Sequence, residues 1–194
     1  VLSPDHTAPT VAVAIYYDVG SRNEERGRSG FAHLFEHMMF QGSENVGKGE
    51  HFQYVINRGG SCNGTTSEDR TNYFETLPSN ELELAIWLEA DRLRSLAVTQ
   101  ANFENQRQTV MEERRQRYDN QPYVSSFIRI NELAFQGYWP YEHSTIGSMD
   151  DLQRAPIAAV QEFFRTYYAP NNAVLAVAGD FEVDHAIRLV ERHF

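Results

Sequence analysis

The sequence predicts an α+β fold in which helices pack against a largely antiparallel sheet. Two patterns lead to this prediction: short stretches that alternate apolar with small or polar residues, and longer stretches with the period of amphipathic helices. In addition, the chain has no internal repeat, low-complexity tract or linker. With 194 residues, of which 41% are hydrophobic, it is long enough to bury one sizeable core. We therefore expect residues 1–194 to form a single domain.

The expected strands lie near the two ends of the chain and in its first half. Val11, Val13 and Ile15 alternate with smaller residues and predict a strand that ends near Asp18. Two later segments are joined by a polar turn at 67–70, which is typical of consecutive strands. The strands after the first are expected at 61–66, 72–77 and 172–178.

Helices are expected wherever apolar residues recur at the helical period. Asn80 and Glu83 have the spacing of a capping box at the start of the third helix. Pro122 ends the fourth helix, and a loop rich in Gly, Pro and aromatic residues follows the fifth. The expected helices are 29–40, 50–57, 80–96, 99–118, 123–135, 157–168 and 183–193.

Composition excludes several classes of protein. The net charge of −10 argues against a general nucleic-acid-binding protein. Cys62 is the only cysteine, which excludes an intrachain disulfide and any zinc site that needs several cysteines. No run of 18 apolar residues is present, so we expect no membrane span. The chain opens almost directly into a strand and ends inside a helical pattern, and we therefore expect a piece of a longer protein.

The segment 33–37, with sequence HLFEH, carries the clearest chemical signal. On a helix, His33, Glu36 and His37 lie within roughly 100° of one another, while the apolar residues around them point the opposite way. Neutral imidazoles at this spacing can hold one Zn²⁺, and a nearby carboxylate can take a proton from a bound water. The order is that of the inverted zincins, H-x-x-E-H. The pattern favours a hydrolase over the plainer alternative, a solvated polar helix face.

A catalytic zinc usually has three protein ligands, so a third ligand is needed. Glu112 and Glu113 are adjacent on a predicted helix and project about 100° apart, so only one of them can face the metal easily. The other carboxylate would pair with an arginine or support the first. Cys62 is the competing ligand, because thiolates also bind zinc. It lies among strand-forming residues, where a buried and inert thiol is the more ordinary outcome.

Several further motifs accompany the metal motif in order along the chain. They are GSRNE at 20–24, GFAHLFEHMMF at 30–40, GGSCNGTT at 59–66, DRTNY at 69–73, EERR at 112–115, PY at 140–141, IG at 146–147 and YYAPNNA at 167–173. Through them the chain resembles the N-terminal half-domain of the M16 peptidases, most of all the compact bacterial members. This family includes pitrilysin, insulin-degrading enzyme and the β subunit of the mitochondrial processing peptidase. The resemblance implies an M16/LuxS-like half-domain, here residues 1–194, that is part of a longer two-domain protein.

The resemblance also implies roles for the residues that match the family's motifs. His33 and His37 would be ligands of one Zn²⁺ per chain, and Glu36 the general base. The motif selects Glu113 as the third ligand and leaves Glu112 as the runner-up, in a supporting position. In the family, the strand after the Gly-Gly turn pairs with an extended substrate. That strand maps to 61–66, with Asn63, Gly64 and Thr65 as the residues expected to contact the peptide.

The function that this resemblance implies is a zinc-dependent endopeptidase that cleaves extended or unfolded peptides. Its second half-domain, in the same polypeptide or in a separate subunit, would complete the substrate chamber, so we expect little activity from this chain alone. The bacterial periplasm or cell envelope is favoured over the cytoplasm. One alternative is a non-catalytic M16-like subunit that serves assembly or substrate presentation. Another is a LuxS-type lyase, but its distal cysteine ligand has no match, since Cys62 lies too near the motif.

Overall fold

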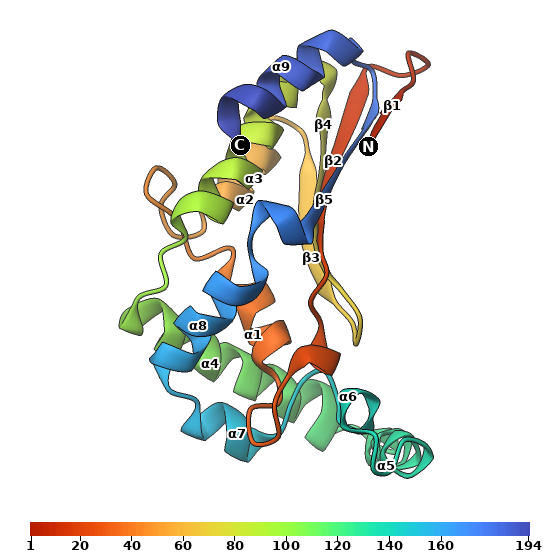
Figure 1. Cartoon of the computed structure of the whole chain (residues 1–194), viewed down its shortest axis with the longest axis vertical. Helices are drawn as coiled ribbons and strands as arrows, with labels where there is room; N and C mark the ends of the chain where they lie inside the picture. The colour runs from red at the N-terminus through yellow and green to blue at the C-terminus, as the bar shows by residue number, and fades with distance from the viewer.

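A five-stranded sheet runs along one side of the molecule, and most helices lie against one face of it (Figure 1). The computed structural model describes residues 1–194 and confirms the predicted α+β class. The strand order is β1-β5-β2-β4-β3, and only the β1–β5 pair is parallel. The strands are β1 (Leu2–Pro4), β2 (Thr10–Tyr17), β3 (Ser61–Thr66), β4 (Thr71–Pro78) and β5 (Ala173–Gly179).

The central strand β2 shows why the sheet has one covered and one open face. Val11, Val13, Ile15 and Tyr17 are buried, while the residues between them are exposed or partly exposed. This two-residue alternation is typical of an antiparallel sheet with helices on one side only. β3 lies at the edge of the sheet and pairs only with β4, with Gly64 opposite Tyr73. β3 is therefore one of the two edges of the sheet, with β1, that another extended chain can reach.

The helices follow the predicted order, and two short ones were not predicted. They are α1 (Phe31–Met38), α2 (Glu50–Ile56), α3 (Leu82–Ser95), α4 (Gln100–Arg114), α5 (Val124–Ala134), α6 (Trp139–Glu142), α7 (Met149–Arg154), α8 (Ile157–Tyr167) and α9 (Val183–His193). Figure 1 shows α2, α3 and α9 beside one half of the sheet, and α1, α4, α7 and α8 grouped beyond its other half. Two apolar cores correspond to these groups, one around α1 and the other between α3, α9 and the sheet.

Three local predictions were wrong. The capping box at Asn80 does not form, because the Asn80 amide donates to Glu81 and a 3₁₀ turn at Ser79–Glu81 precedes α3. The single helix predicted over 99–118 is divided: α4 ends at Arg114, and a π-helical turn continues to Asp119. The loop predicted after residue 135 contains the short helices α6 and α7.

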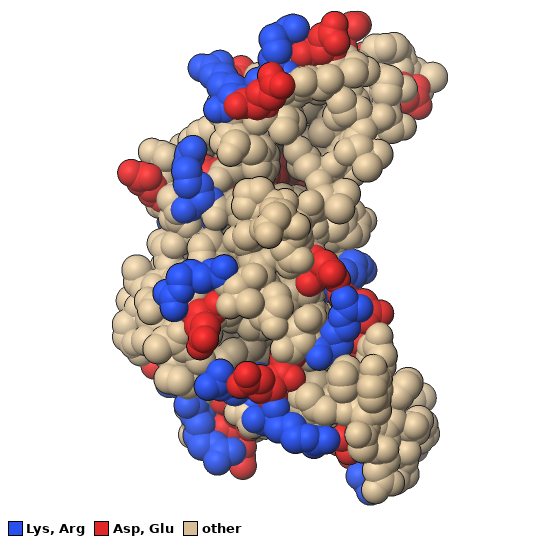
Figure 2. Space-filling model, viewed as in Figure 1, with Lys and Arg blue, Asp and Glu red and all other residues tan.

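The surface has two further features. Figure 2 shows acidic and basic side chains lying next to one another over the face in view, without a large patch of one sign. Helix α5 buries none of its residues, and Phe127 and Ile130 are among the exposed apolar side chains that it presents to solvent. No helix has both the length and the apolar character needed to cross a membrane.

Candidate metal centre

The start of α1 is fixed by a buried carboxylate. Glu24 is fully buried and accepts hydrogen bonds from the backbone N–H groups of Gly30 and Ala32, at 2.9 and 2.8 Å. His143 Nε2 lies 3.0 Å from the same carboxylate. Gly30 has a φ of 90°, and a Cβ there would approach the carbonyl oxygen of Ile146 to 2.8 Å, so the position requires glycine. These contacts set the direction in which α1 leaves the loop.

Helix α1 has the two faces that the sequence predicts. Leu34, Phe35 and Met38 are fully buried in the core around α1. His33, Glu36 and His37 lie on the other face and are only partly exposed. Burial of the apolar face therefore orients the polar face towards α4 and the edge strand.

Three side chains from α1 and α4 converge on one point. Glu113 Oε2 lies 3.3 Å from His37 Nε2 and 3.8 Å from His33 Nε2. The two imidazole centroids are 4.8 Å apart. Burial and the nearby His37 lower the pKa of His33 to about 3, so this imidazole is neutral at pH 7 and its lone pair is available. Two imidazole nitrogens and one carboxylate oxygen match the donor set of known catalytic zinc sites. These residues therefore fit a Zn²⁺ ion.

The cluster lines an open hollow of roughly 390 Å³. Glu36 lies in the same hollow, and its Oε2 accepts a hydrogen bond from the hydroxyl of Thr66 on β3. Burial raises the pKa of the Glu36 carboxyl, and the Thr66 hydroxyl partly offsets this. The lining residues are His33, Glu36, His37, Phe40, Gln41, Phe52, Asn63, Gly64, Gln106, Glu113 and Arg117.

The two neighbouring glutamates on α4 face different surroundings. Glu112 is exposed; it accepts a hydrogen bond from Gln116 and pairs with Arg115 at 3.2 Å. Glu113 faces the histidines, and its other carboxylate oxygen lies 2.8 Å from a guanidinium nitrogen of Arg117. Arg117 belongs to the π-helical turn after α4 and was not predicted as a site residue from the sequence. Its only sequence signal was the four-residue spacing from Glu113.

The residues predicted to contact substrate are divided between two environments. Asn63 and Gly64 line the hollow, and the Gly64 N–H donates to the Asn63 side chain at 2.9 Å. Thr65 does not line it, because its hydroxyl bonds to Asn72 and accepts from Arg70. Cys62 is not part of the cluster; burial raises the pKa of its thiol to about 11, which disfavours the thiolate needed for metal binding.

A second group of ligand-type side chains lies inside the protein. His51 Nε2 is 2.9 Å from Glu75 Oε2, and Glu89 lies close to both. All three are buried, and Arg92 donates two hydrogen bonds to the Glu89 carboxylate. The Arg92 guanidinium therefore already balances the negative charge of the Glu89 carboxylate, which is the role that a metal ion would otherwise have in this group.

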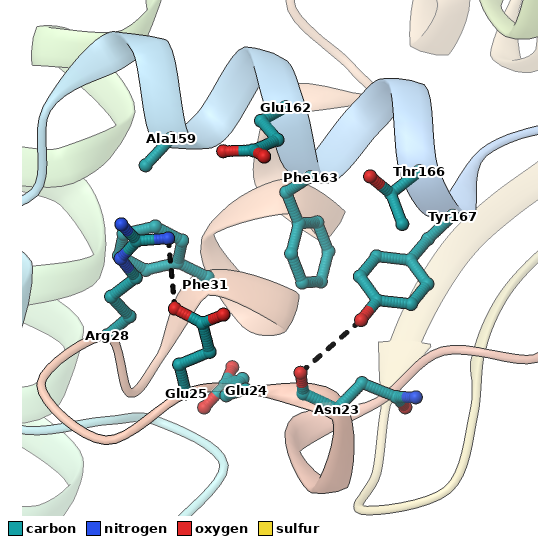
Figure 3. A pocket seen from close by; sticks show the side chains of 10 residues that line it. All are labelled: Asn23, Glu24, Glu25, Arg28, Phe31, Ala159, Glu162, Phe163, Thr166 and Tyr167. Carbon is teal, nitrogen blue, oxygen red and sulfur yellow. Dashed lines mark hydrogen bonds and ion pairs between the residues drawn. The ribbon is translucent and has the colours of Figure 1, made fainter.

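A separate pocket lies between α8 and the loop before α1 (Figure 3). Phe31 and Phe163 form its apolar part, and Arg28 pairs with Glu25 at 3.1 Å near its rim. The Tyr167 hydroxyl donates to the carbonyl of Asn23 at 3.4 Å. None of the three residues of the metal cluster lines this pocket.

Curated relatives match almost the whole chain. The zinc protease PqqE of Helicobacter pylori is 38% identical over 184 residues, which cover 95% of this chain and 41% of the relative. Subunit 1 of the bovine mitochondrial cytochrome b-c1 complex is 27% identical and matches 100% of this chain and 40% of its own length. The chain thus spans about two fifths of the length of these relatives.

Solved structures share the fold. A protease from Helicobacter pylori superposes with a TM-score of 0.92 at 36% identity, over 96% of this chain and 44% of that one. The periplasmic protease PqqL of Escherichia coli gives a TM-score of 0.88 at 22% identity, over 99% of this chain and 22% of that one. At 22% identity, the similarity to PqqL shows a shared fold and nothing about function.

Two family models cover the sequence. The model described as insulinase, peptidase family M16, matches residues 1–143, and the model described as the peptidase M16 inactive domain matches residues 155–194. The first match includes the H-x-x-E-H segment and Glu113. The chain belongs to peptidase family M16, the insulinase family.

Proposed function

We propose that this chain is the metal-binding, catalytic domain of a zinc-dependent endopeptidase. One observation carries the proposal: His33, His37 and Glu113 direct ligand atoms to one point of an open hollow that also contains Glu36. The family match and the 38% identity to a zinc protease support the same chemistry. The proposed reaction is the hydrolysis of peptide bonds in extended or unfolded peptides.

The ligand set fits one Zn²⁺ per chain, held by His33, His37 and Glu113. When bound, the zinc ion supplies Lewis acidity, which polarises a carbonyl and lowers the pKa of a water molecule to about 7. Glu112 would have no direct role, since it is exposed and paired with Arg115. Arg117 would help to hold Glu113 through the carboxylate oxygen that does not face the histidines.

Glu36 is the proposed general base. It would take a proton from the attacking water and deliver it to the leaving amine. Its partly buried position raises its pKa, and a carboxylate with a raised pKa is a stronger base. Because His33 and His37 flank it on the same helix face, its carboxylate would lie next to the reacting water.

The edge strand β3 is the proposed binding site for the peptide. An extended peptide can add to an exposed edge by backbone hydrogen bonds, which are largely independent of side-chain sequence. Asn63 and Gly64 line the hollow beside the metal cluster and would contact the peptide close to the scissile bond. Thr65 would contribute through its backbone, because its side chain is bonded to Asn72 and Arg70.

We further propose that residues 1–194 are the N-terminal domain of a longer protein. A second M16 half-domain, in cis or as a separate subunit, would cover the open hollow and complete the chamber. The length of the relatives supports this, since the chain matches only 41% of the Helicobacter pylori zinc protease. The proposed compartment is the bacterial periplasm or cell envelope, the compartment of the Escherichia coli structural neighbour.

A non-catalytic subunit is the second candidate function. The match to subunit 1 of the cytochrome b-c1 complex favours it, because that relative is named as a subunit of a larger complex. The complete H-x-x-E-H segment and the convergence with Glu113 favour the peptidase. The two candidates differ in whether the chain, once paired with a complementary half, cleaves peptides.

The test is Glu36→Gln in the metal-loaded chain paired with a complementary half-domain. We expect peptidase activity to fall by about 10²- to 10⁴-fold, the usual contribution of a general base, while zinc content stays at one per chain. Glu112→Gln is the matched control and should keep full activity. A wild-type pair that binds zinc but cleaves no unfolded peptide would favour the non-catalytic subunit. Substantial activity in the Glu36 variant would remove the base assignment.

A further inference from the structure

The proposed base is held by the same strand that would bind the peptide. Gly64 and Thr66 are two residues apart on β3, so they share one face of the strand, and this face is turned towards α1. The Thr66 hydroxyl donates to Oε2 of Glu36. It is the one hydrogen bond that the chain makes to this carboxylate, which leaves Oε1 without a protein partner.

The aliphatic part of Glu36 rests against the same strand. A Cβ at Gly64 would lie 3.1 Å from Glu36 Cγ and 3.1 Å from the Tyr73 ring, so the side chain passes close over the glycine backbone. Tyr73 is fully buried and pairs with Gly64 across the sheet. Glu36 therefore lies against a rigid surface along its stem, and its carboxylate is held at the end by Thr66.

Thr66 is itself well fixed. It pairs with Thr71 on β4, and Thr71 is fully buried with its hydroxyl donating to the Val19 carbonyl at 2.9 Å. Threonine is β-branched and has few allowed χ1 rotamers, whereas glutamate has three rotatable bonds. The Thr66 hydroxyl is therefore held in one place, and its hydrogen bond restricts the more flexible carboxylate of Glu36.

We propose that Thr66 is a positioning residue for the general base. It holds Oε2 of Glu36 so that Oε1 remains the proton acceptor in the hollow. Since Thr66 is on the strand that would pair with substrate, the base keeps a constant place relative to a peptide aligned on β3. The inference rests on the proposed function, because it assigns a role to Thr66 only if Glu36 is the base.

The test compares Thr66→Val, which removes the hydroxyl and keeps the shape, with Thr66→Ser, which restores the hydroxyl. Each variant is measured with the complementary half for kcat, KM and zinc content. Thr66→Val should lower kcat by about 10- to 100-fold, as expected for loss of a hydrogen bond to a charged group. KM and zinc content should not change, and Thr66→Ser should recover most of kcat. Thr76→Val, at an exposed threonine of the neighbouring strand β4, is the matched control and should behave as wild type.

The outcomes separate this inference from the proposed function. If Glu36→Gln inactivates the enzyme but Thr66→Val does not, the positioning role is overturned and the base assignment stands. If Thr66→Ser is as impaired as Thr66→Val, the loss reflects packing of the strand, and the positioning role is again overturned. If Glu36→Gln has no effect on activity, the proposed function fails and the inference fails with it.

Discussion

Two clusters in this chain contain the same kinds of side chain, yet only one is suited to a metal. The cluster of His33, His37 and Glu113 has side chains that are 14–23% exposed and line an open hollow. The inner cluster of His51, Glu75 and Glu89 is sealed, with side chains at most 5% exposed. Access to solvent is the first difference between them.

The second difference is the source of positive charge. In the inner cluster, Arg92 is buried, donates to Glu89 and has its guanidinium 4.4 Å from the centre of the Tyr73 ring. In the outer cluster the nearest arginine, Arg117, is 74% exposed and touches only the oxygen of Glu113 that does not face the histidines. These two differences favour the outer cluster over the inner one as the candidate metal site.

Arg92→Met should have the largest effect on stability. It leaves the Glu89 carboxylate buried without its partner, and breaking a buried ion pair in this way typically costs about 3–5 kcal/mol. Urea unfolding of the metal-free chain measures this. Arg94→Met on the same helix is the control, since Arg94 is exposed and should change stability little. If the two variants lowered the free energy of unfolding equally, the buried Arg92–Glu89 pair would contribute no more to stability than an exposed arginine.

Glu113→Gln should weaken zinc binding by about 100-fold or more, because loss of even a supporting group around a metal costs 10- to 100-fold. Competition with a chromogenic chelator measures the change. Zinc should fall from one per chain towards none, since Arg92 already pairs with the inner cluster and we expect no zinc to bind there. Glu112→Gln should leave zinc affinity as it is; the reverse pattern would transfer the ligand role to Glu112.

The inner cluster should also make stability depend on pH. Burial raises the pKa of Glu75 to about 8 and lowers that of His51 to about 3. Above about pH 6.5, the unfolded chain loses the remaining charge of His51, which is neutral in the folded state, but folded Glu75 keeps a proton that the unfolded chain has lost. The folded state then binds more protons, so stability falls by about 1 kcal/mol between pH 6.5 and 8. Between about pH 4.5 and 6.5, the opposite contribution of His51 cancels this slope.

Glu75→Gln isolates this contribution. Glutamine keeps a polar partner for His51 and does not titrate, so the part of the slope due to Glu75 should disappear. Denaturant unfolding at pH 6.5, 7.2 and 8 measures it in both proteins. An unchanged slope in the variant would assign the pH dependence to other groups, of which the buried Glu24–His143 pair is the first to test.

Cys62→Ser should have the smallest effect. The thiol is half-buried, outside the metal cluster, and its raised pKa keeps it protonated at pH 7. Zinc content should be unchanged, and stability should change by less than about 1 kcal/mol. Loss of zinc from this variant would revive a cysteine-ligated site of the lyase type.

Local sequence pattern predicted most of the fold, and its errors have physical causes. The alternation in β2 and the amphipathic period of α1 were sufficient to place these elements. Strand β1 was not predicted, because its three residues carry no alternation and it forms only through pairing with β5. Helix α7 was missed although a signal was present: Ser148 accepts from the N–H of Asp151, which is the Ser-x-x-Asp cap.

The metal motif was predictable, whereas its surroundings required tertiary contacts. His33, Glu36 and His37 are near neighbours on one helix, so their spacing alone places them together. The choice between Glu112 and Glu113 depends on how α4 is rotated against α1, which the residues alone left open and only the resemblance decided. Thr66 and the inner cluster were missed because the residues that they contact are distant in the sequence. One signal was present, since Glu75 is at one of the alternate positions of β4 whose side chains are buried.

The proposed metal ligands His37 on α1 and Glu113 on α4 are 76 positions apart in the chain, and this has a consequence for unfolding. A metal ion held by both α1 and α4 acts as a reversible cross-link that closes a long loop. Because the site exists only in the folded chain, metal binding would stabilise the folded state, so the stability of the domain would depend on the concentration of free metal. Chelation would therefore loosen the packing of α4 against α1 as well as remove the chemistry.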